Sequence, residues 1–379
     1  MKSYEEQFKK FKKLKELSGN HSPSINQIEE FFPEIKIEVD GCYLSNPYAT
    51  NLFEKYLRKH MKNNLISLIG KYPSQNKELS VRVGNSIGVN PKNLFIGNGA
   101  SEIIQAIISN FSKKVISILP TFSAYYDNNE KNTIFYKLDK NNNFKLDVND
   151  LINFTKNSSA DTLVLINPNN PDGSIIEKKD LIKILTSLKN LNNIIIDESF
   201  IDFTSDDPEK FSLMKEYSKF KNLIIIRSLA KDFGLPGIRI GFSIMSEEKV
   251  NKLYESGFLW NINGFAEYFY KIYSTPKFKN QYANLRKKYY HELKDFKKKL
   301  ESLPNLTIYD SKANFFLVEL PHHFDSDEFA FRILYKHGIY LRSCSDKKGL
   351  NNKFIRIAVR STEENKKIIS ALRKELQWS

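Results

Sequence analysis

The side chains that could do chemistry in this chain gather around one lysine. Lys231 follows the apolar run 223–226, which predicts a buried strand, and Ser228 lies between that run and the lysine. Arg239 comes eight residues after Lys231, beyond a turn rich in glycine and proline. This combination suits a phosphorylated aldehyde, because the amine can form a Schiff base while the hydroxyl and the guanidinium hold the phosphate. A lysine after a strand is more often an ordinary solvated loop residue, so the prediction depends on the segments around it.

Two more predicted strands end in polar residues. Residues 163–166 lead into an asparagine- and proline-rich turn that contains Asn170, and residues 194–196 lead directly to Asp197. Open α/β sheets gather their ligand groups at the carboxyl ends of strands, so we expect the three segments to meet at one edge of a sheet. From about residue 92 the chain alternates short β-branched runs with helical stretches, which predicts a mostly parallel sheet covered by helices.

Together and in this order, these segments resemble the class I/II aminotransferases, the fold-type-I enzymes that use pyridoxal phosphate (PLP). The resemblance runs from about residue 44 to the C-terminus. It implies an α/β large domain with a mostly parallel seven-stranded sheet and helices on both faces, plus a smaller α+β domain from the two chain ends. The expected divisions are an N-terminal helix and leading segment at 1–44, belonging to the small domain, the PLP-binding domain at 45–275 and the C-terminal small domain at 276–379.

The resemblance also implies how the cofactor is held. Lys231 would carry PLP, and the carboxylate of Asp197 would keep the pyridine nitrogen protonated, so that the ring can accept electrons from the substrate. These two are the predicted catalytic residues. Asn170 would bond the phenolic oxygen and Phe122 would stack on the pyridine face, although core packing is the ordinary role of such a ring. The predicted phosphate cradle, at a helix N-terminus that follows residues 94–96 and at the lysine segment, is formed by Ala100, Ser101, Ser228 and Arg239.

One tyrosine points to a second subunit. Tyr72 resembles the tyrosine that reaches the phosphate of the neighbouring subunit's cofactor, which implies a homodimer with shared active sites. The helix expected at residues 4–18 and the break after it at 19–23 suit either a module that follows an upstream domain or a simple loop.

The resemblance gives four residues that would bind the substrate. Arg356 matches the arginine that holds an α-carboxylate with a two-point fork, and Asn170 lies beside the cofactor. Arg360 lies four residues after Arg356, so strand alternation puts both on one face, although a surface position for Arg360 is the other interpretation. Tyr48, in an Asn-Pro-Tyr segment, resembles the tyrosine that seats the substrate's phosphate in histidinol-phosphate aminotransferases.

These features favour the branch whose substrates carry phosphorus. Short segments around Tyr48 and Tyr72 look most like aminotransferase domains fused behind a cytidylyltransferase domain in phosphonate biosynthesis, which interconvert phosphonoacetaldehyde and 2-aminoethylphosphonate with an amino acid or keto acid partner. We therefore expect a ping-pong aminotransferase of that kind. Histidinol-phosphate aminotransferase and threonine-phosphate decarboxylase are the alternatives. The latter is favoured by Arg360 and by Phe200, which stands where most aminotransferases have a tyrosine.

Composition argues against several other classes of protein. The formal net charge is +14, but the lysines are spread among acidic residues and no nucleic-acid-binding signature occurs, so we expect no nucleic-acid partner. A PLP-sensing regulator would need a DNA-binding domain, and the region before residue 40 is too short for one. Two cysteines, no apolar leader and no run of roughly 18 apolar residues predict a cytoplasmic protein without a membrane span. No histidine or cysteine spacing predicts a metal site.

Overall fold

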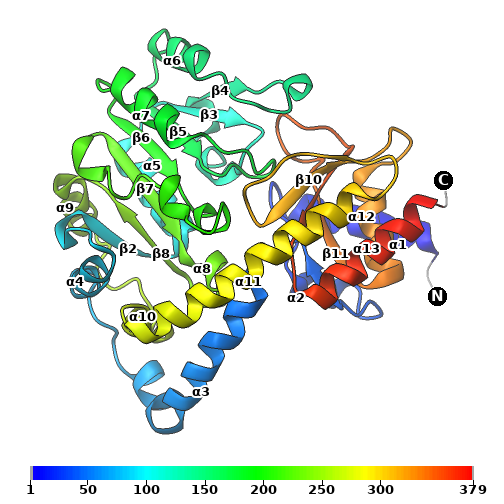
Figure 1. Cartoon of the computed structure of the whole chain (residues 1–379), viewed down its shortest axis with the longest axis horizontal. Helices are drawn as coiled ribbons and strands as arrows, with labels where there is room; N and C mark the ends of the chain where they lie inside the picture. Colours follow the sequence, from blue (N-terminus) through cyan, green and yellow to red (C-terminus); the bar gives the residue numbers. More distant parts are fainter. Residues whose placement is uncertain (1–2, 378–379) are drawn as a thin grey trace.

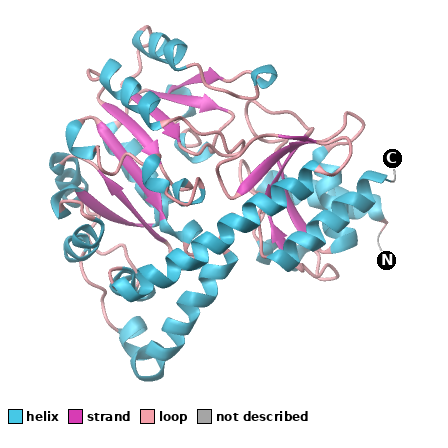
Figure 2. Ribbon diagram, viewed as in Figure 1, coloured by secondary structure: helices cyan, strands magenta, loops and turns pink. Residues whose placement is uncertain are grey.

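The computed structural model describes residues 3–377, in which a long helix connects two β-sheets (Figures 1 and 2). The larger sheet has seven strands in the order β2-β8-β7-β6-β5-β3-β4, and β8 runs opposite to the other six. The predicted mostly parallel seven-stranded sheet is therefore confirmed. Its strands are β2 (Leu94–Asn98), β3 (Val115–Leu119), β4 (Thr133–Lys137), β5 (Thr162–Ile166), β6 (Asn193–Asp197), β7 (Leu223–Ser228) and β8 (Ile240–Ile244).

The central strands of this sheet are apolar along most of their length because helices cover both faces. Every residue of β5, β6 and β7 is buried. One face packs on α5 (Gly99–Phe111) and α9 (Glu247–Glu255). The helices of the other face are α3 (Pro47–Gly70), α4 (Asn76–Ile87), α6 (Val148–Lys156), α7 (Lys178–Ser187) and α10 (Gly264–Tyr273).

The smaller sheet joins the two ends of the chain. Its order is β1-β11-β12-β10-β9, and β1 (Val39–Gly41) runs parallel to β11 (Ile339–Ser343). The other strands are β9 (Thr307–Ile308), β10 (Phe315–Glu319) and β12 (Phe354–Ala358), and helices α12 (Ser326–His337) and α13 (Thr362–Gln377) pack on them.

The connecting helix α11 (Pro276–Glu301) belongs to both cores. Phe278 and Tyr282 in its first half pack with the large sheet, whereas Tyr289 and Phe296 pack with the small one. The helix crosses between the two sheets in Figure 1. The division expected at residue 275 would therefore fall at the start of a helix that both domains share, and it stays a prediction.

The N-terminal helix is an integral part of the small domain. α1 (Tyr4–Leu17) begins with a capping box formed by Ser3 and Glu6. The ring of Phe11 lies 5.2 Å from that of Phe331 on α12, and Lys15 is buried in an ion pair with Asp327. A second short helix, α2 (Ile25–Phe31), packs in the same cluster. The break between these helices is thus a loop within the small domain.

Residues 3–377 contain neither a membrane-spanning helix nor a cluster of metal ligands. None of their helices is long and apolar enough to cross a membrane. Nor do they contain a group of three or more histidine, cysteine or acidic side chains arranged to hold a metal ion.

Candidate active site

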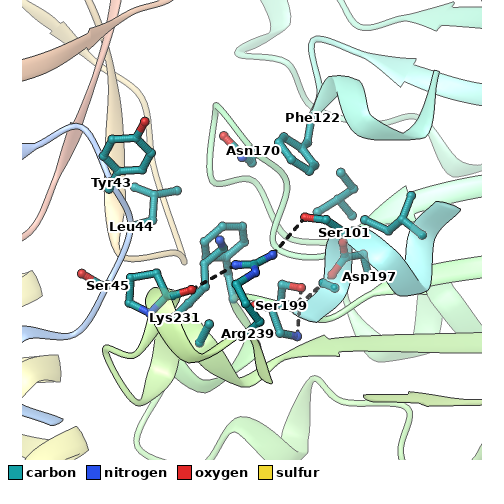
Figure 3. Close-up of a pocket in the computed structure, with 17 residues that line it drawn as sticks. Tyr43, Leu44, Ser45, Ser101, Phe122, Asn170, Asp197, Ser199, Lys231 and Arg239 are labelled. Carbon is teal, nitrogen blue, oxygen red and sulfur yellow. Dashed lines mark hydrogen bonds between the residues drawn. The ribbon is translucent and has the colours of Figure 1, made fainter. Parts of the chain in front are cut away.

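A cavity lies where the carboxyl ends of β5, β6 and β7 meet the N-terminus of α5, and the segment 43–45 from the small-domain side closes it (Figure 3). This is the edge at which the sequence predicted a site. Eight of the predicted residues line it, namely Ala100, Ser101, Phe122, Asn170, Asp197, Ser228, Lys231 and Arg239.

Lys231 is presented by α8 (Leu229–Asp232), a single helical turn that directly follows β7. Its backbone carbonyl accepts a hydrogen bond from Asn46, which ties the lysine turn to the segment before α3. Its Nζ lies 5.4 Å from the centre of the Phe200 ring, where no hydroxyl is available. Burial lowers the pKa of Lys231 to about 8, and the positive charges of Arg356 and Arg239 act in the same direction while Asp197 opposes them. An amine with such a pKa is partly neutral, and therefore nucleophilic, near neutral pH.

Asp197 ends β6 with its carboxyl group held by two donors. The hydroxyl of Tyr125 donates to Oδ2 at 2.8 Å, and the backbone N–H of Ser199 donates to Oδ1 at 2.9 Å. Burial raises the pKa of Asp197, and these hydrogen bonds and the charge of Lys231 oppose that effect. A protonated pyridine nitrogen would add a further opposing charge, so this carboxyl group is suited to hold one.

The N-terminus of α5 and Arg239 form a cradle for an anion. The N-cap residue Asn98 makes no side-chain bond to the first turn, so the N–H groups there are left for another acceptor. Gly99 has φ +76°, and a Cβ at this position would lie 2.8 Å from Nη2 of Arg239. Arg239 also has a positive φ, 57°, and its Nη2 lies 3.5 Å from Oγ of Ser101, as drawn in Figure 3. The cradle fits the phosphate of PLP.

Ser228 and Phe122 complete this side of the cavity. The backbone N–H of Ser228 donates to Oγ of Ser199 at 3.2 Å, which joins the ends of β6 and β7. Phe122 is partly buried beside Asn170 in Figure 3, and the ring of His21 lies 5.9 Å from it. His21 comes from the loop between α1 and α2, so the N-terminal segment reaches the edge of the site.

Arg356 is buried on β12 and connects the site to the small domain. Its Nη1 donates to Oδ1 of Asn170 at 2.7 Å, and its Nη2 donates to the carbonyl of Cys42 at 2.7 Å. Its buried Nε has no partner among the described residues. The guanidinium therefore keeps a donor for a ligand, while Asn170 and Cys42 fix its position.

Besides Arg356, which reaches the lining only through Asn170, three predicted residues lie outside the cavity lining. Tyr48 turns its hydroxyl toward Glu292 and Thr362, at 3.2 Å from each. Arg360 is buried, so it is not the surface residue of the alternative interpretation, and its Nη1 donates to Ser45, which does line the cavity. Tyr72 is 93% exposed. The structure therefore does not bring these three side chains to Lys231, and their roles in binding stay predictions.

Sequence reasoning missed several residues that the fold brings to this site. Arg342 on β11 is the direct cross-strand partner of Arg356, and both are buried. Tyr125 lies three residues after Phe122, and its contact with Asp197 depends on the pairing of distant segments. Tyr43 and Ser45 line the cavity as well. Arg342 stands two residues before Cys344 in an apolar strand, and only its charge within such a strand could have signalled it.

Similarity to known proteins extends over almost the whole chain. The L-serine phosphate decarboxylase of Campylobacter jejuni is 46% identical over 370 residues, which cover 96% of this chain and 95% of that protein. The L-serine phosphate decarboxylase of Sulfurospirillum multivorans is 38% identical over 378 residues, which cover 98% of this chain and 96% of that protein. A solved structure of a decarboxylase from Sulfurospirillum multivorans matches with a TM-score of 0.93, at 38% identity, over 99% of this chain and 97% of that one.

Histidinol-phosphate aminotransferases are also among the relatives, in agreement with the branch expected from the sequence. Residues 45–372 match the family model for aminotransferase class I and II. The chain is therefore a PLP-dependent enzyme of the aminotransferase class I and II family.

Proposed function

We propose that this enzyme decarboxylates an O-phosphorylated amino acid, with L-serine phosphate as the substrate. The observation that carries the proposal is the pair of buried guanidinium groups on neighbouring strands, Arg342 and Arg356. Such a pair suits a small substrate with two anionic groups, because Arg356 can face a carboxylate while Arg342, which also pairs with Asp346, lies toward a phosphate. The near-full-length similarity to two L-serine phosphate decarboxylases supports the same substrate.

The chain supplies the groups that such a reaction needs. When bound, PLP withdraws the electron pair that remains on the α-carbon as carbon dioxide leaves. Lys231 holds the cofactor and is the acid that returns one proton to the α-carbon, so that L-serine phosphate yields carbon dioxide and phosphoethanolamine. Asp197 keeps the pyridine nitrogen protonated, Phe122 covers the ring, and Arg356 with Asn170 orients the substrate. The Gly99–Arg239 cradle holds the cofactor's phosphate.

We also propose that the enzyme is a homodimer with shared active sites. Tyr72 is exposed on the monomer together with Ile66, Ile69 and Trp260, whose exposed fractions are 79%, 66% and 55%. The segments that carry them are adjacent, since Asn76 bonds the carbonyl of Leu259. A cluster of large apolar side chains of this kind is typical of a protein interface. A second copy would cover it and bring Tyr72 toward the partner's cofactor.

Transamination of 2-aminoethylphosphonate, with an upstream cytidylyltransferase domain, is the second candidate. The same paired arginines support it, because a phosphonate also carries two negative charges. The relatives named above favour decarboxylation, and Phe200 beside Lys231 agrees with the decarboxylase pattern noted in the sequence.

One assay separates these candidates. Holoenzyme is incubated with L-serine phosphate in heavy water, and phosphorus and proton NMR follow the product together with released carbon dioxide. We expect phosphoethanolamine with one deuterium on the former α-carbon, and no need for a keto acid. Parallel reactions contain L-threonine phosphate, histidinol phosphate or 2-aminoethylphosphonate with pyruvate or 2-oxoglutarate. Amino transfer to the keto acid without carbon dioxide release would reject the decarboxylase assignment.

A further inference from the structure

The loop between β11 and β12 crosses from the small domain to the edge of the active site. Gly349 in this loop has φ +86°, and a Cβ there would lie 3.1 Å from the backbone nitrogen of Pro120. Lys348 forms an ion pair of 2.7 Å with Glu130 of the large domain. The loop therefore rests against the segment that leads directly into Phe122, on the cavity wall.

Lys347 in this loop is held by the N-terminal segment. Its Nζ donates to the carbonyl of Asn20 at 2.7 Å, and Arg342 donates to the same carbonyl at 3.4 Å. The side chain of Asn20 donates to Asp127 of the large domain at 2.6 Å. The next residue, His21, contacts the ring of Phe122. The ammonium group of Lys347 is thus held by the residue before His21, and His21 contacts Phe122 on the cavity wall.

The charge of Lys347 is buried without a matching carboxylate. The residue is 7% exposed, and among residues 3–377 no acidic oxygen lies within 4.0 Å of its Nζ. The adjacent Asp346 interacts instead with Arg342 and Lys15. Burial lowers the pKa of Lys347 to about 8, and the charge of Arg342 acts in the same direction while the more distant charge of Asp346 opposes it. A buried ammonium without a counter-charge is costly, and an anionic ligand would remove that cost.

Three buried cations are linked to Lys231 one after another. Arg356 is close enough to Lys231 to influence its pKa, Arg342 is the cross-strand partner of Arg356, and Lys347 shares the Asn20 carbonyl with Arg342. In L-serine phosphate the amine and the phosphate are at opposite ends. A substrate whose amine faces Lys231 therefore has its phosphate directed away from that lysine.

We propose that Lys347 binds the phosphate of the substrate and makes the enzyme select phosphorylated over unphosphorylated amino acids. This inference rests on the proposed function of the site. The N-terminal segment 19–21 then belongs to the substrate-binding apparatus, because its Asn20 carbonyl positions the ammonium group. The competing interpretation is that Lys347 only fastens the loop to the N-terminal segment, which any donor at this position would do regardless of substrate.

The test compares Lys347→Met with Lys347→Arg and with Lys348→Met, a matched control whose ammonium pairs with Glu130 at the surface. Melting temperature and cofactor absorbance first establish that each variant is folded and loaded. For L-serine phosphate we expect Lys347→Met to raise KM roughly ten- to a hundredfold, the loss of one charge-assisted contact, with a smaller change in kcat. Lys347→Arg should recover part of the loss, and Lys348→Met should stay within about twofold of wild type.

Two binding measurements make the result independent of turnover. Inorganic phosphate should compete with the substrate in the wild type, and its inhibition constant should rise in Lys347→Met by a factor similar to that of KM. L-serine has no phosphate, so its dissociation constant, measured by spectral titration of the holoenzyme, should be the same in the wild type and in Lys347→Met. An equal loss for serine and serine phosphate, or unchanged phosphate inhibition, would reject the role of Lys347. Wild-type enzyme that binds serine phosphate through Lys347 without releasing carbon dioxide would instead reject the proposed reaction.

Discussion

Tyr125 donates a hydrogen bond to Asp197 at 2.8 Å, and both side chains are buried. Burial alone favours the neutral form of this carboxyl group, whereas the hydroxyl of Tyr125 and the N–H of Ser199 favour its anion. The floor of the site is therefore arranged to keep a carboxylate charged in an environment with little water. A charged Asp197 is suited to keep the pyridine nitrogen of PLP protonated.

The charge of Asp197 should matter more than its shape. Asp197→Asn keeps the size of the side chain but removes the negative charge that holds the pyridine nitrogen protonated. We expect kcat/KM to fall by about 10³-fold or more, as when a main electrostatic interaction is removed from an active site. Steady-state kinetics on variant enzyme with a full complement of PLP measures this. Activity within tenfold of the wild type would mean that another group holds the nitrogen.

Removing the Tyr125 hydroxyl should have a smaller effect of the same kind. Tyr125→Phe keeps the buried ring but leaves Asp197 with one donor fewer, which costs roughly 1.5–3 kcal/mol for a charged acceptor. We expect kcat/KM to fall by between tenfold and a hundredfold, with weaker binding of PLP. The double variant with Asp197→Asn should be no worse than Asp197→Asn alone, because the hydroxyl acts through the carboxylate. Independent, multiplied losses would contradict that link.

Lys231 should be indispensable. Lys231→Ala removes the amine that holds the cofactor and the acid that protonates the α-carbon, so turnover should be lost together with the visible absorbance of lysine-bound PLP. The cofactor can still occupy the Gly99–Arg239 cradle without a covalent bond. Lys210→Ala, at an exposed lysine, serves as the control. Normal turnover by Lys231→Ala would reject the assignment.

Capture of PLP by the apoenzyme should depend on pH through the same amine. Because burial lowers the pKa of Lys231 to about 8, the neutral amine is scarce well below this pH and predominates above it. The rate constant for capture, followed by stopped-flow absorbance, should rise about tenfold per pH unit below 8 and level off above it. A rise that continues to pH 10 would show that the amine keeps the ordinary pKa of a lysine.

Arg356 in β12 and Arg360 just beyond it should differ in effect. Arg356 contacts Asn170 and retains a free Nε, so Arg356→Ala should raise the KM for L-serine phosphate by roughly ten- to a hundredfold. Arg360 reaches Ser45 and Glu364 instead, so Arg360→Ala should act less, through the position of the 43–45 segment. Initial-rate kinetics over a range of substrate concentrations decides this. A larger effect at Arg360 would place it in direct contact with the substrate.

Tyr72 should act on the cofactor only in the dimer. We expect a mass of twice 44.1 kDa by light scattering. Tyr72→Phe should raise the dissociation constant of PLP several-fold without changing this mass, because the lost hydroxyl belongs to the partner's phosphate site. Tyr335→Phe, a similarly substituted exposed tyrosine on α12, should leave PLP binding unchanged. A monomer with full cofactor affinity would reject the shared site.

The sequence predicted those parts of the site that depend on local patterns. Strands such as β6 and β7 are continuous apolar runs ended by polar residues, so Asp197 and Lys231 could be placed from the chain alone. Arg342 and Lys347 could not, because their importance comes from contacts with Asn20, more than 300 residues away. Alternation along the strand predicted that Arg356 and Arg360 share one face, but it could not show that Arg360, beyond the end of β12, donates to Ser45.

The pairing of β1 with β11 has a consequence for the order in which the protein matures. Val39 lies opposite Ile339, so β1 cannot pair with β11 until about 300 further residues have been synthesised. During translation the large sheet can assemble first, as domains generally fold in units. The N-terminal segment with Asn20 then closes onto a loop near the other end of the chain. Nascent chains halted before residue 339 should therefore bind PLP poorly and leave the N-terminal helices open to proteolysis.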